Sequence, residues 1–161
     1  MIDTVVQKVV LSRPGVWLYS RLAHHLDRLV YRLTGGRATL ASMTTGVPIG
    51  LVTTTGAKSG LSRTVPLLRV PDDQDPRRFA LIASNWGQER HPAWYFNLKA
   101  NPHATCSIRG QEQEYVAHEA SSEEYERFWQ RAVDIYPWYK VYRERASERR
   151  IPIMIMTVAD S

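Results

Sequence analysis

The spacing of hydrophobic and polar positions divides most of the chain into short strands and four helical stretches. Apolar runs bounded by Gly, Pro, Asp or Asn are typical of strands, because those residues favour turns. On this basis we expect strands at 49–55, 64–70, 78–84, 103–109, 112–119 and 151–158. Apolar residues at helical spacing predict helices at 16–33, at 91–100, from Ser121 or Ser122 as a cap to about 135, and at 139–145.

Most of these strands are joined by short turns, which favours antiparallel neighbours. About six such strands with flanking helices predict an α+β, mainly β, fold built on a small barrel. We expect two parts: residues 1–45 as an N-terminal amphipathic helical segment, and residues 46–161 as the barrel domain. A turn with strong breakers, 71–76, separates the second and third predicted strands.

The predicted N-terminal helix has two distinct faces. Between Val16 and Leu33, leucines recur at steps of three and four residues, and the basic face of Arg21, His25, Arg28 and Arg32 follows the same steps. Such a helix covers a core or forms a dimer contact in one interpretation. In the other, its arginines bring it to an anionic membrane surface. The sequence leaves both interpretations open.

The charge of the chain is basic and concentrated near its start. The formal net charge is +5, and residues 1–50 hold six Lys/Arg against two Asp. A basic segment suits an anionic membrane or a nucleic acid. Because no recognised nucleic-acid motif is present, we predict no nucleic-acid partner.

The remaining composition is that of an ordinary globular protein of 161 residues. Cys106 is the only cysteine, so no disulfide can form within the chain, and its place in a predicted strand favours a buried structural thiol. The first residues lack the pattern of a signal peptide, and no apolar stretch is long enough to span a bilayer. We therefore expect a cytoplasmic protein.

A loop rich in glycine, hydroxyls and cations joins the first two predicted strands. From Thr53 to Arg63 it reads TTTGAKSGLSR. Backbone N–H groups, hydroxyls and the charges of Lys58 and Arg63 together suit a phosphate or a carboxylate. This is not a P-loop, because Gly56 lies only two residues before Lys58 and a strand follows. A hairpin loop with solvated charges is the alternative.

Two further segments offer groups for a site. Tyr136, Tyr139 and Tyr142 recur at intervals of three around Pro137, and three phenols could line a pocket for a flat, apolar substrate. Core and rim aromatics are the alternative. The helix that opens at His91 presents an N-terminus that can hold an anion. Its alternative is an ordinary helix start with inward-packed aromatics.

The sequence lacks the residue patterns of a metal site and of a hydrolase. The histidines have no partners at ligand spacing, so we predict no metal site. No nucleophile elbow of the Gly-x-Ser-x-Gly kind is present, which argues against a hydrolase.

Taken in order, these segments resemble the deazaflavin-dependent nitroreductase family. The motifs are Thr-Thr-Thr-Gly-x-Lys-Ser-Gly-x-x-Arg-x-x-Pro-Leu, a serine at 84, His-Pro-x-Trp-Tyr-x-Asn-Leu-x-Ala-Asn-Pro, Tyr-Pro-x-Tyr-x-x-Tyr, and Arg149-Arg150-Ile151-Pro152. Together they cover residues 48–158. The resemblance implies a split β-barrel that uses the deazaflavin coenzyme F420.

The resemblance also implies a site. In it, Lys58 with Arg63 grips the coenzyme phosphate and the start of its oligoglutamate tail, and Ser84 orients or protonates a substrate carbonyl or nitro group. Four positions are implied to be catalytic and to border the substrate: Ser84, Tyr136, Tyr139 and Tyr142. The positions implied to bind the coenzyme are Ala57, Lys58, Ser59, Gly60, Leu61, Ser62, Arg63, Pro66, Ala83, Ser84, Asn85, Ala93, Trp94, Tyr95, Phe96, Asn97 and Tyr139.

The chain departs from the family pattern at three places. Ala57 stands where the family often has Arg, and Asn85-Trp86 replaces a frequent Lys-Gly. Both changes remove a cation that would face the coenzyme. Leu68 stands where some members have an aromatic residue facing the substrate.

The function that the resemblance implies is hydride transfer from reduced F420 to a quinone, enone or nitro-type acceptor. A non-catalytic F420 carrier and a flavin mononucleotide enzyme of the same barrel class are the alternatives. The implied partners are a quinone-like small molecule and, through the N-terminal helix, peripheral contact with the inner face of an anionic membrane. A monomer and a homodimer both fit.

Overall fold

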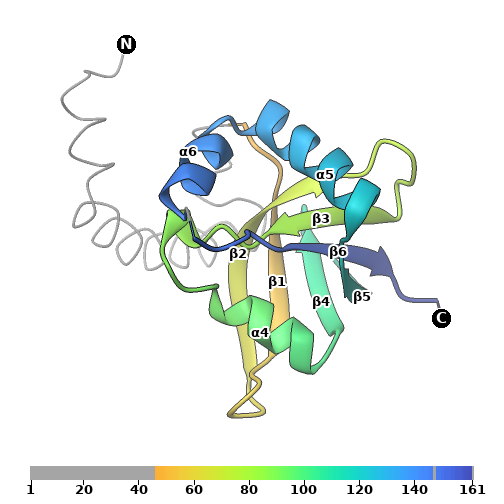
Figure 1. The fold of residues 1–161 in the computed structure, drawn as a ribbon. Coiled ribbons are helices and arrows are strands. Elements are labelled where there is room, and N and C mark those ends of the chain that lie inside the picture. The colour runs from red at the N-terminus through yellow and green to blue at the C-terminus, as the bar shows by residue number, and fades with distance from the viewer. Residues whose placement is uncertain (1–45, 147, 161) are drawn as a thin grey trace.

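The computed structural model describes residues 46–146 and 148–160. Within them lie six strands, three α-helices and one 3-10 turn (Figure 1). In chain order these are β1 (Ile49–Thr55), β2 (Ser62–Pro71), β3 (Arg78–Ile82), η1 (Asn85–Gly87), α4 (Ala93–Ala100), β4 (His103–Ile108), β5 (Gln111–Glu119), α5 (Ser122–Ile135), α6 (Trp138–Arg145) and β6 (Ile153–Val158). The helix predicted at 16–33 and the segment 1–45 lie outside the described residues.

The strands form one closed barrel in the order β1-β2-β3-β6-β5-β4. Every neighbouring pair is antiparallel. The barrel closes where β1 pairs with β4, with Val52 opposite Cys106. The predicted fold class, a mainly β barrel of antiparallel strands with flanking helices, is confirmed.

The barrel interior is apolar because alternate strand positions point inward. Val52, Leu81 and Met156 are buried there, and α4 adds Trp94 and Leu98 at one end of the barrel (Figure 1). Cys106 lies in this interior with no exposed surface, and burial raises the pKa of its thiol to about 12. The expected structural thiol is confirmed.

A second core lies outside the barrel, beneath α5 and α6. In α5 the buried residues are spaced by three and four positions, which makes one apolar face: Tyr125, Phe128, Trp129, Ala132 and Val133. This face packs on outward residues of the strands, among them Val70, Ile82 and Ile155. Ser121 occupies the N-cap of α5, but its side chain makes no capping hydrogen bond, so the predicted side-chain cap is wrong.

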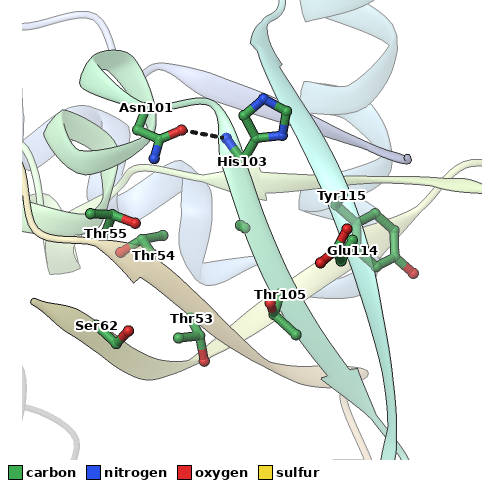
Figure 2. A pocket seen from close by; sticks show the side chains of 10 residues that line it. Thr53, Thr54, Thr55, Ser62, Asn101, His103, Thr105, Glu114 and Tyr115 are labelled. Carbon is green, nitrogen blue, oxygen red and sulfur yellow. Dashed lines mark hydrogen bonds between the residues drawn. The ribbon is translucent and has the colours of Figure 1, made fainter. Parts of the chain in front are cut away.

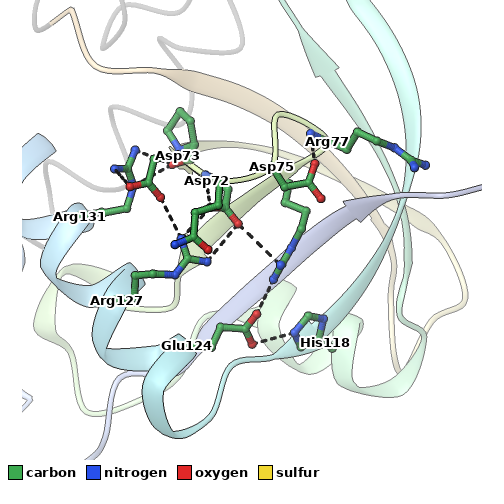
Figure 3. A network of polar contacts seen from close by, with 11 residues as sticks. Asp72, Asp73, Asp75, Arg77, His118, Glu124, Arg127 and Arg131 are labelled. Carbon is green, nitrogen blue, oxygen red and sulfur yellow. Dashed lines mark hydrogen bonds and ion pairs between the residues drawn. The ribbon is translucent and has the colours of Figure 1, made fainter.

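An ion-pair network fastens α5 to the hairpin between β2 and β3 (Figure 3). The guanidinium of Arg127 donates to both carboxylate oxygens of Asp72, at 2.7 and 3.2 Å. These hydrogen bonds are the main reason why the pKa of Asp72 falls to about 2. Glu124 of α5 also contacts Arg78 and His118. The network fixes the turn at 71–76, which lies where the sequence predicts it.

The element bounds differ from the predicted ones mainly near the expected site. β2 begins at Ser62 rather than 64, because Ser62 and Arg63 pair with Thr55 and Thr54. β3 ends at Ile82 rather than 84, since Ser84 opens the turn η1. α4 begins at Ala93, with Pro92 as its N-cap. Two of the expected site residues, Ser62 and Arg63, therefore lie on a strand and not in the loop.

Candidate functional site

The cation loop, residues 56–61 between β1 and β2, is closed by its own backbone. Gly56 N–H donates to the Leu61 carbonyl at 2.8 Å, and Gly60 N–H donates to the Gly56 carbonyl at 2.8 Å. Gly60 has a φ of +67°, which suits glycine. A Cβ on Gly56 would lie 2.6 Å from Ser59 Oγ, so the turn is too tight for a side chain there.

Asn97 of α4 holds this loop in place. Its Oδ1 accepts the Ala57 N–H at 2.9 Å, and its Nδ2 donates to Thr54 Oγ1 at 3.0 Å. The residue is only 8% exposed. Its amide is therefore engaged with the protein itself, and we infer that Asn97 shapes the loop from behind.

The loop and the first residues of β2 display two cations, near exposed apolar side chains. Lys58 and Arg63 are exposed, and neither makes an ion pair with a carboxylate of the described residues. Leu61 is 59% exposed and Phe96 of α4 is 51% exposed. Exposed apolar groups next to unpaired cations suit a ligand that is anionic at one end and flat and apolar at the other.

The other expected residues of α4 divide between two faces. Trp94 packs in the barrel interior, with 7% of its surface exposed. Tyr95 is half-buried and donates from its hydroxyl to Glu119 Oε2 at 3.0 Å. Burial is the first cause of the raised pKa of Tyr95, and the bond to Glu119 adds to it. Among the expected site residues of α4, only Ala93 and Phe96 are exposed, so these two are the ones that a ligand can reach directly.

Ser84 lies at the start of an unusual turn. The residue is 8% exposed, and its hydroxyl makes no hydrogen bond to any described residue. Three successive residues follow with positive φ: Asn85 at 46°, Trp86 at 59° and Gly87 at 75°. Left-handed backbone at Asn and Trp is strained and needs support from its surroundings. Asn85 gives some of it, because its Nδ2 donates to the Arg90 carbonyl at 2.8 Å.

This turn packs directly on α6. A Cβ on Gly87 would lie 2.8 Å from Arg145 Cβ and 3.0 Å from the Tyr142 carbonyl oxygen, so only glycine fits. The ring of Trp86 meets that of Tyr142 edge-on, with centroids 6.1 Å apart. The turn that begins at Ser84 is thereby packed against α6, which carries Tyr139 and Tyr142.

The three tyrosines form one cluster, as their spacing predicts. Ring centroids lie 5.4 Å apart for Tyr136–Tyr139 and 6.1 Å apart for Tyr139–Tyr142. The hydroxyls of Tyr136 and Tyr142 are 3.4 Å apart. Tyr139 and Tyr142 are buried, whereas Tyr136 is half-buried. Two rings thus belong to the core and Tyr136 lies at its rim, which is the arrangement of the core-and-rim interpretation.

Burial also determines the protonation of these phenols. It is the first cause of the raised pKa of Tyr139 and of Tyr142, and the neighbouring Tyr136 raises both further. The two phenols therefore remain neutral hydrogen-bond donors at physiological pH. Leu68 of β2 and Trp86 pack against the second core, to which Tyr139 and Tyr142 belong.

The cation loop and the tyrosine cluster are connected through α4 and the segment before it. α4 lies next to the cation loop, and the segment from β3 to α4 runs from α4 toward α6 (Figure 1). The cation loop and the tyrosines are thus linked through α4 and residues 84–91. Of the remaining expected positions, Pro66 is half-buried on β2 and Ala83 is fully buried.

Ser62 borders a different hollow of about 330 Å³ (Figure 2). Its lining comes from β1, β2, β4 and β5 with the link before β4, and is mostly polar: Thr53, Thr54, Thr55, Ser62, Asn101, His103, Ala104, Thr105, Glu114 and Tyr115. Ser62 is the only one of them that the sequence assigns to a site. The structure therefore does not join this hollow to the tyrosine cluster.

One site contributor is missed by the sequence interpretation. Arg149 enters there only as part of a motif, yet its guanidinium bonds to the backbone of the Ser84 segment and to His91. Its place in the motif Arg149-Arg150-Ile151-Pro152 was the signal in the sequence that could have identified it. Among residues 46–146 and 148–160, no group of three or more His, Cys, Asp or Glu could hold a metal ion. In that same part of the chain, no helix has the length and apolar character to cross a membrane.

Comparison with known proteins finds a family model and a relative that carry the same name. The family model for F420H(2)-dependent quinone reductases matches residues 24–158. An F420H(2)-dependent quinone reductase of Mycobacterium tuberculosis strain H37Rv is 32% identical over 88% of this chain and 95% of its own length.

Two solved structures are also similar. One, an F420-H2 dependent reductase (FDR-A), is 43% identical, has a TM-score of 0.61, and matches over 68% of this chain and 93% of its own. The other, described as a domain-swapped dimer, is 36% identical with a TM-score of 0.64, over 89% of this chain and 98% of its own.

Proposed function

Because the chain belongs to the F420H(2)-dependent quinone reductase family, we propose that it binds its coenzyme along the face from the cation loop to α6 and reacts beside Ser84. The protein is an enzyme, with F420H2 as its reductant and a quinone as its acceptor. The observation that carries the placement is the pair of cations, Lys58 and Arg63, near exposed Leu61 and Phe96.

The residues of this face fit such a coenzyme. Its phosphate and oligoglutamate tail are anionic, and Lys58 and Arg63 supply unpaired positive charge at a loop that Asn97 holds in shape. Its ring system is flat and apolar, which suits Leu61 and Phe96. The preformed loop spares the protein an ordering cost when it binds.

When bound, F420H2 supplies a hydride, so the protein needs to hold the acceptor, exclude bulk water and let a proton reach it. We assign the hydrogen bond to the acceptor oxygen to Ser84, whose hydroxyl has no hydrogen-bond partner among the described residues. Its O–H would donate a hydrogen bond to the acceptor oxygen, where negative charge develops, and would keep its own proton; the proton that completes the reduction would come from solvent. No acidic side chain is required at this position.

The tyrosines are assigned to the acceptor pocket. Tyr136, the half-buried member, faces the edge of the cluster, while Tyr139 and Tyr142 stay protonated behind it. Neutral phenols can donate hydrogen bonds to a quinone oxygen without placing a charge in the pocket. Leu68 packs against the core that contains Tyr139 and Tyr142 and would affect the range of acceptors.

Turnover with menadione tests the assignment of Ser84. Ser84→Ala should lower kcat/KM for menadione by about 100-fold, the effect of losing one donor to a developing oxyanion, with F420 affinity unchanged. Ser107→Ala, a half-buried serine of β4, is the matched control and should keep full activity. Full activity of Ser84→Ala would remove this serine from the reaction.

We also propose that the basic N-terminal part brings the enzyme to anionic membranes, where lipophilic quinones reside. The support is the sequence pattern alone, with arginines at helical steps between 16 and 33. Replacing Arg28 and Arg32 with Gln should release the protein from vesicles containing phosphatidylglycerol but leave menadione turnover intact. Unchanged vesicle binding would favour a packing role for this helix.

The assembly state is a proposal of the same kind. A structure that is 36% identical is described as a domain-swapped dimer, which supports a homodimer here. Sedimentation equilibrium would separate the dimer from a monomer by its mass.

A further inference from the structure

We propose that Arg149 is a positioning residue for the reaction site, which fixes the backbone of the Ser84 turn and holds His91 with its proton on Nε2. The inference rests on the proposed function, because Ser84 belongs to the site assigned there. It also makes a claim about His91 that can be tested without coenzyme.

Arg149 donates to three backbone carbonyls of one short segment. Its Nη1 lies 3.2 Å from the Ala83 oxygen and its Nη2 lies 2.6 Å from the Ser84 oxygen. Its Nε lies 2.8 Å from the Gln88 oxygen. These carbonyls stand on both sides of the residues with positive φ. The planar, rigid guanidinium therefore ties the beginning of the turn to its end.

The backbone of this turn is strained and needs contacts that hold it in place. Asn85 and Trp86 have φ values of 46° and 59°, which residues with a Cβ adopt at a cost in energy. A strained backbone persists only where its surroundings determine it from several sides. Packing of Gly87 on Tyr142 and the bond from Asn85 to the Arg90 carbonyl supply two constraints, and Arg149 supplies another. Since Ser84 opens this turn, the position of its hydroxyl depends on all three.

The same guanidinium sets the tautomer of His91. Arg149 Nη1 lies 3.0 Å from His91 Nδ1. A guanidinium has only donors, so Nδ1 must accept and therefore carries no proton. In the neutral ring the proton is then on Nε2. The ring lies against Tyr95 and Phe96, with centroids 5.0 and 5.9 Å away, so it belongs to the exposed end of the proposed coenzyme face.

The charges around His91 keep it neutral. Burial lowers the pKa of His91, the positive charge of Arg149 lowers it further, and Glu119 on β5 acts in the opposite direction. Glu119 is itself bonded to Lys99 and Tyr95 of α4. The carboxylate that could favour a charged imidazole is thus already engaged. With Nδ1 occupied by Arg149, the neutral His91 ring offers an N–H donor at Nε2.

Arg150 provides a matched control. It is the next residue and carries the same charge, but its guanidinium stacks over the Tyr125 ring, 4.1 Å from the centroid. Arg150→Met changes net charge and side-chain length by the same amount as Arg149→Met, and it removes no hydrogen bond to the Ser84 turn.

The first test is nuclear magnetic resonance of the full chain without coenzyme. Long-range ¹H–¹⁵N spectra of the histidine rings, assigned by loss of a signal in His91→Gln, report which ring nitrogen carries the proton. We expect an unprotonated Nδ1 and a protonated Nε2 for His91 at pH 7. In Arg149→Met both tautomers should appear and the pKa of His91 should rise, whereas Arg150→Met should leave the ring unchanged.

The second test is turnover of F420H2 with menadione. Arg149→Met should lower kcat at least tenfold with F420 affinity within threefold, and Arg149→Lys should recover part of kcat while keeping the low pKa of His91. A proton on Nδ1 of His91 in the unmodified protein would overturn the proposal even if Arg149→Met fails to fold. Unchanged kcat in a folded Arg149→Met would overturn it as well. Lack of any turnover by the unmodified protein would instead contradict the proposed function, and the His91 tautomer would still be measured.

Discussion

The side-chain oxygen of Asn97 accepts the backbone N–H of Ala57 at 2.9 Å and so joins α4 to the cation loop across 40 positions of sequence. The other half of the same amide reaches Thr54 of β1. One buried side chain thereby sets the shape of the loop that carries Lys58. The loop is prepared for an anion before any ligand arrives.

Removal of this link should loosen the loop. Asn97→Ala leaves the Ala57 N–H and the Thr54 hydroxyl without their partner, so we expect a loss of about 1–3 kcal/mol in stability and about tenfold in F420 affinity. Urea unfolding and fluorescence titration measure the two effects. Asn101→Ala, which removes one bond to the exposed His103 N–H, is the control and should keep F420 affinity. Equal losses in both variants would contradict a special role for Asn97.

Two glycines with similar backbone angles should respond differently to alanine. Gly87 has a φ of 75°, and a Cβ there would lie 2.8 Å from Arg145 Cβ, whereas Gly60 has a φ of 67° and nothing within 4 Å. Gly87→Ala should cost about 2–4 kcal/mol and reduce menadione turnover, since strain and overlap add. Gly60→Ala should cost about 1 kcal/mol. Thermal unfolding distinguishes them, and similar shifts would mean that the turn does not pack on α6 as described.

The Asp72–Arg127 pair should make stability depend on pH. The pKa of Asp72 in the folded protein is about 2, below the ordinary value of 3.8. The ionised carboxylate therefore stabilises the fold fully above about pH 4, and this stabilisation is lost as the pH falls toward 2. Asp72→Asn should lower stability by about 2 kcal/mol at pH 6, and the difference should shrink between pH 4 and 2.

Asp160→Asn supplies the comparison for Asp72, because Asp160 pairs with Arg77 at the exposed surface. Such pairs contribute little, so its unfolding curve should follow that of the unmodified protein. A constant difference between Asp72→Asn and the unmodified protein across the whole pH range would contradict the assigned pKa.

Cys106 should be inert in the folded protein. Its side chain is fully buried and its pKa is raised to about 12, so almost no thiolate exists at pH 8. We expect iodoacetamide to label it only after denaturation, as measured by mass spectrometry. Rapid labelling of the native protein would show that the barrel interior opens readily.

The strands and helices were predictable because their signals are local. Breakers such as Pro71 and Gly110 bound the runs, and apolar spacing identifies the buried face of α5. The order of the strands around the barrel was not predictable, because the β1–β4 and β3–β6 pairs join segments that are distant in sequence. Periodicity indicates which side of a strand is buried, but it does not indicate the partner strand.

The site was predictable as a set of segments and not as a set of contacts. Helical spacing places Trp94, Asn97 and Leu98 on one buried face of α4, but motif membership does not distinguish such residues from Phe96, which is exposed. The left-handed backbone at Trp86 has no sequence signal, since neither Asn nor Trp favours it as glycine does. The bonds of Arg149 go to main-chain carbonyls 61 to 66 positions away, which leave no pattern in side chains.

The most direct test of the account is a fluorescence titration of F420 into three forms of the protein. These are the unmodified chain, Lys58→Ala with Arg63→Ala, and Arg77→Ala with Arg109→Ala, a control that removes the same charge from exposed positions outside the proposed coenzyme face. If Lys58 and Arg63 hold the coenzyme anion, their loss should weaken binding by roughly 2–4 kcal/mol, about 30- to 1000-fold, and the control should stay within threefold. Equal affinity of the Lys58/Arg63 variant and the unmodified protein would contradict the placement of the coenzyme on the cation loop.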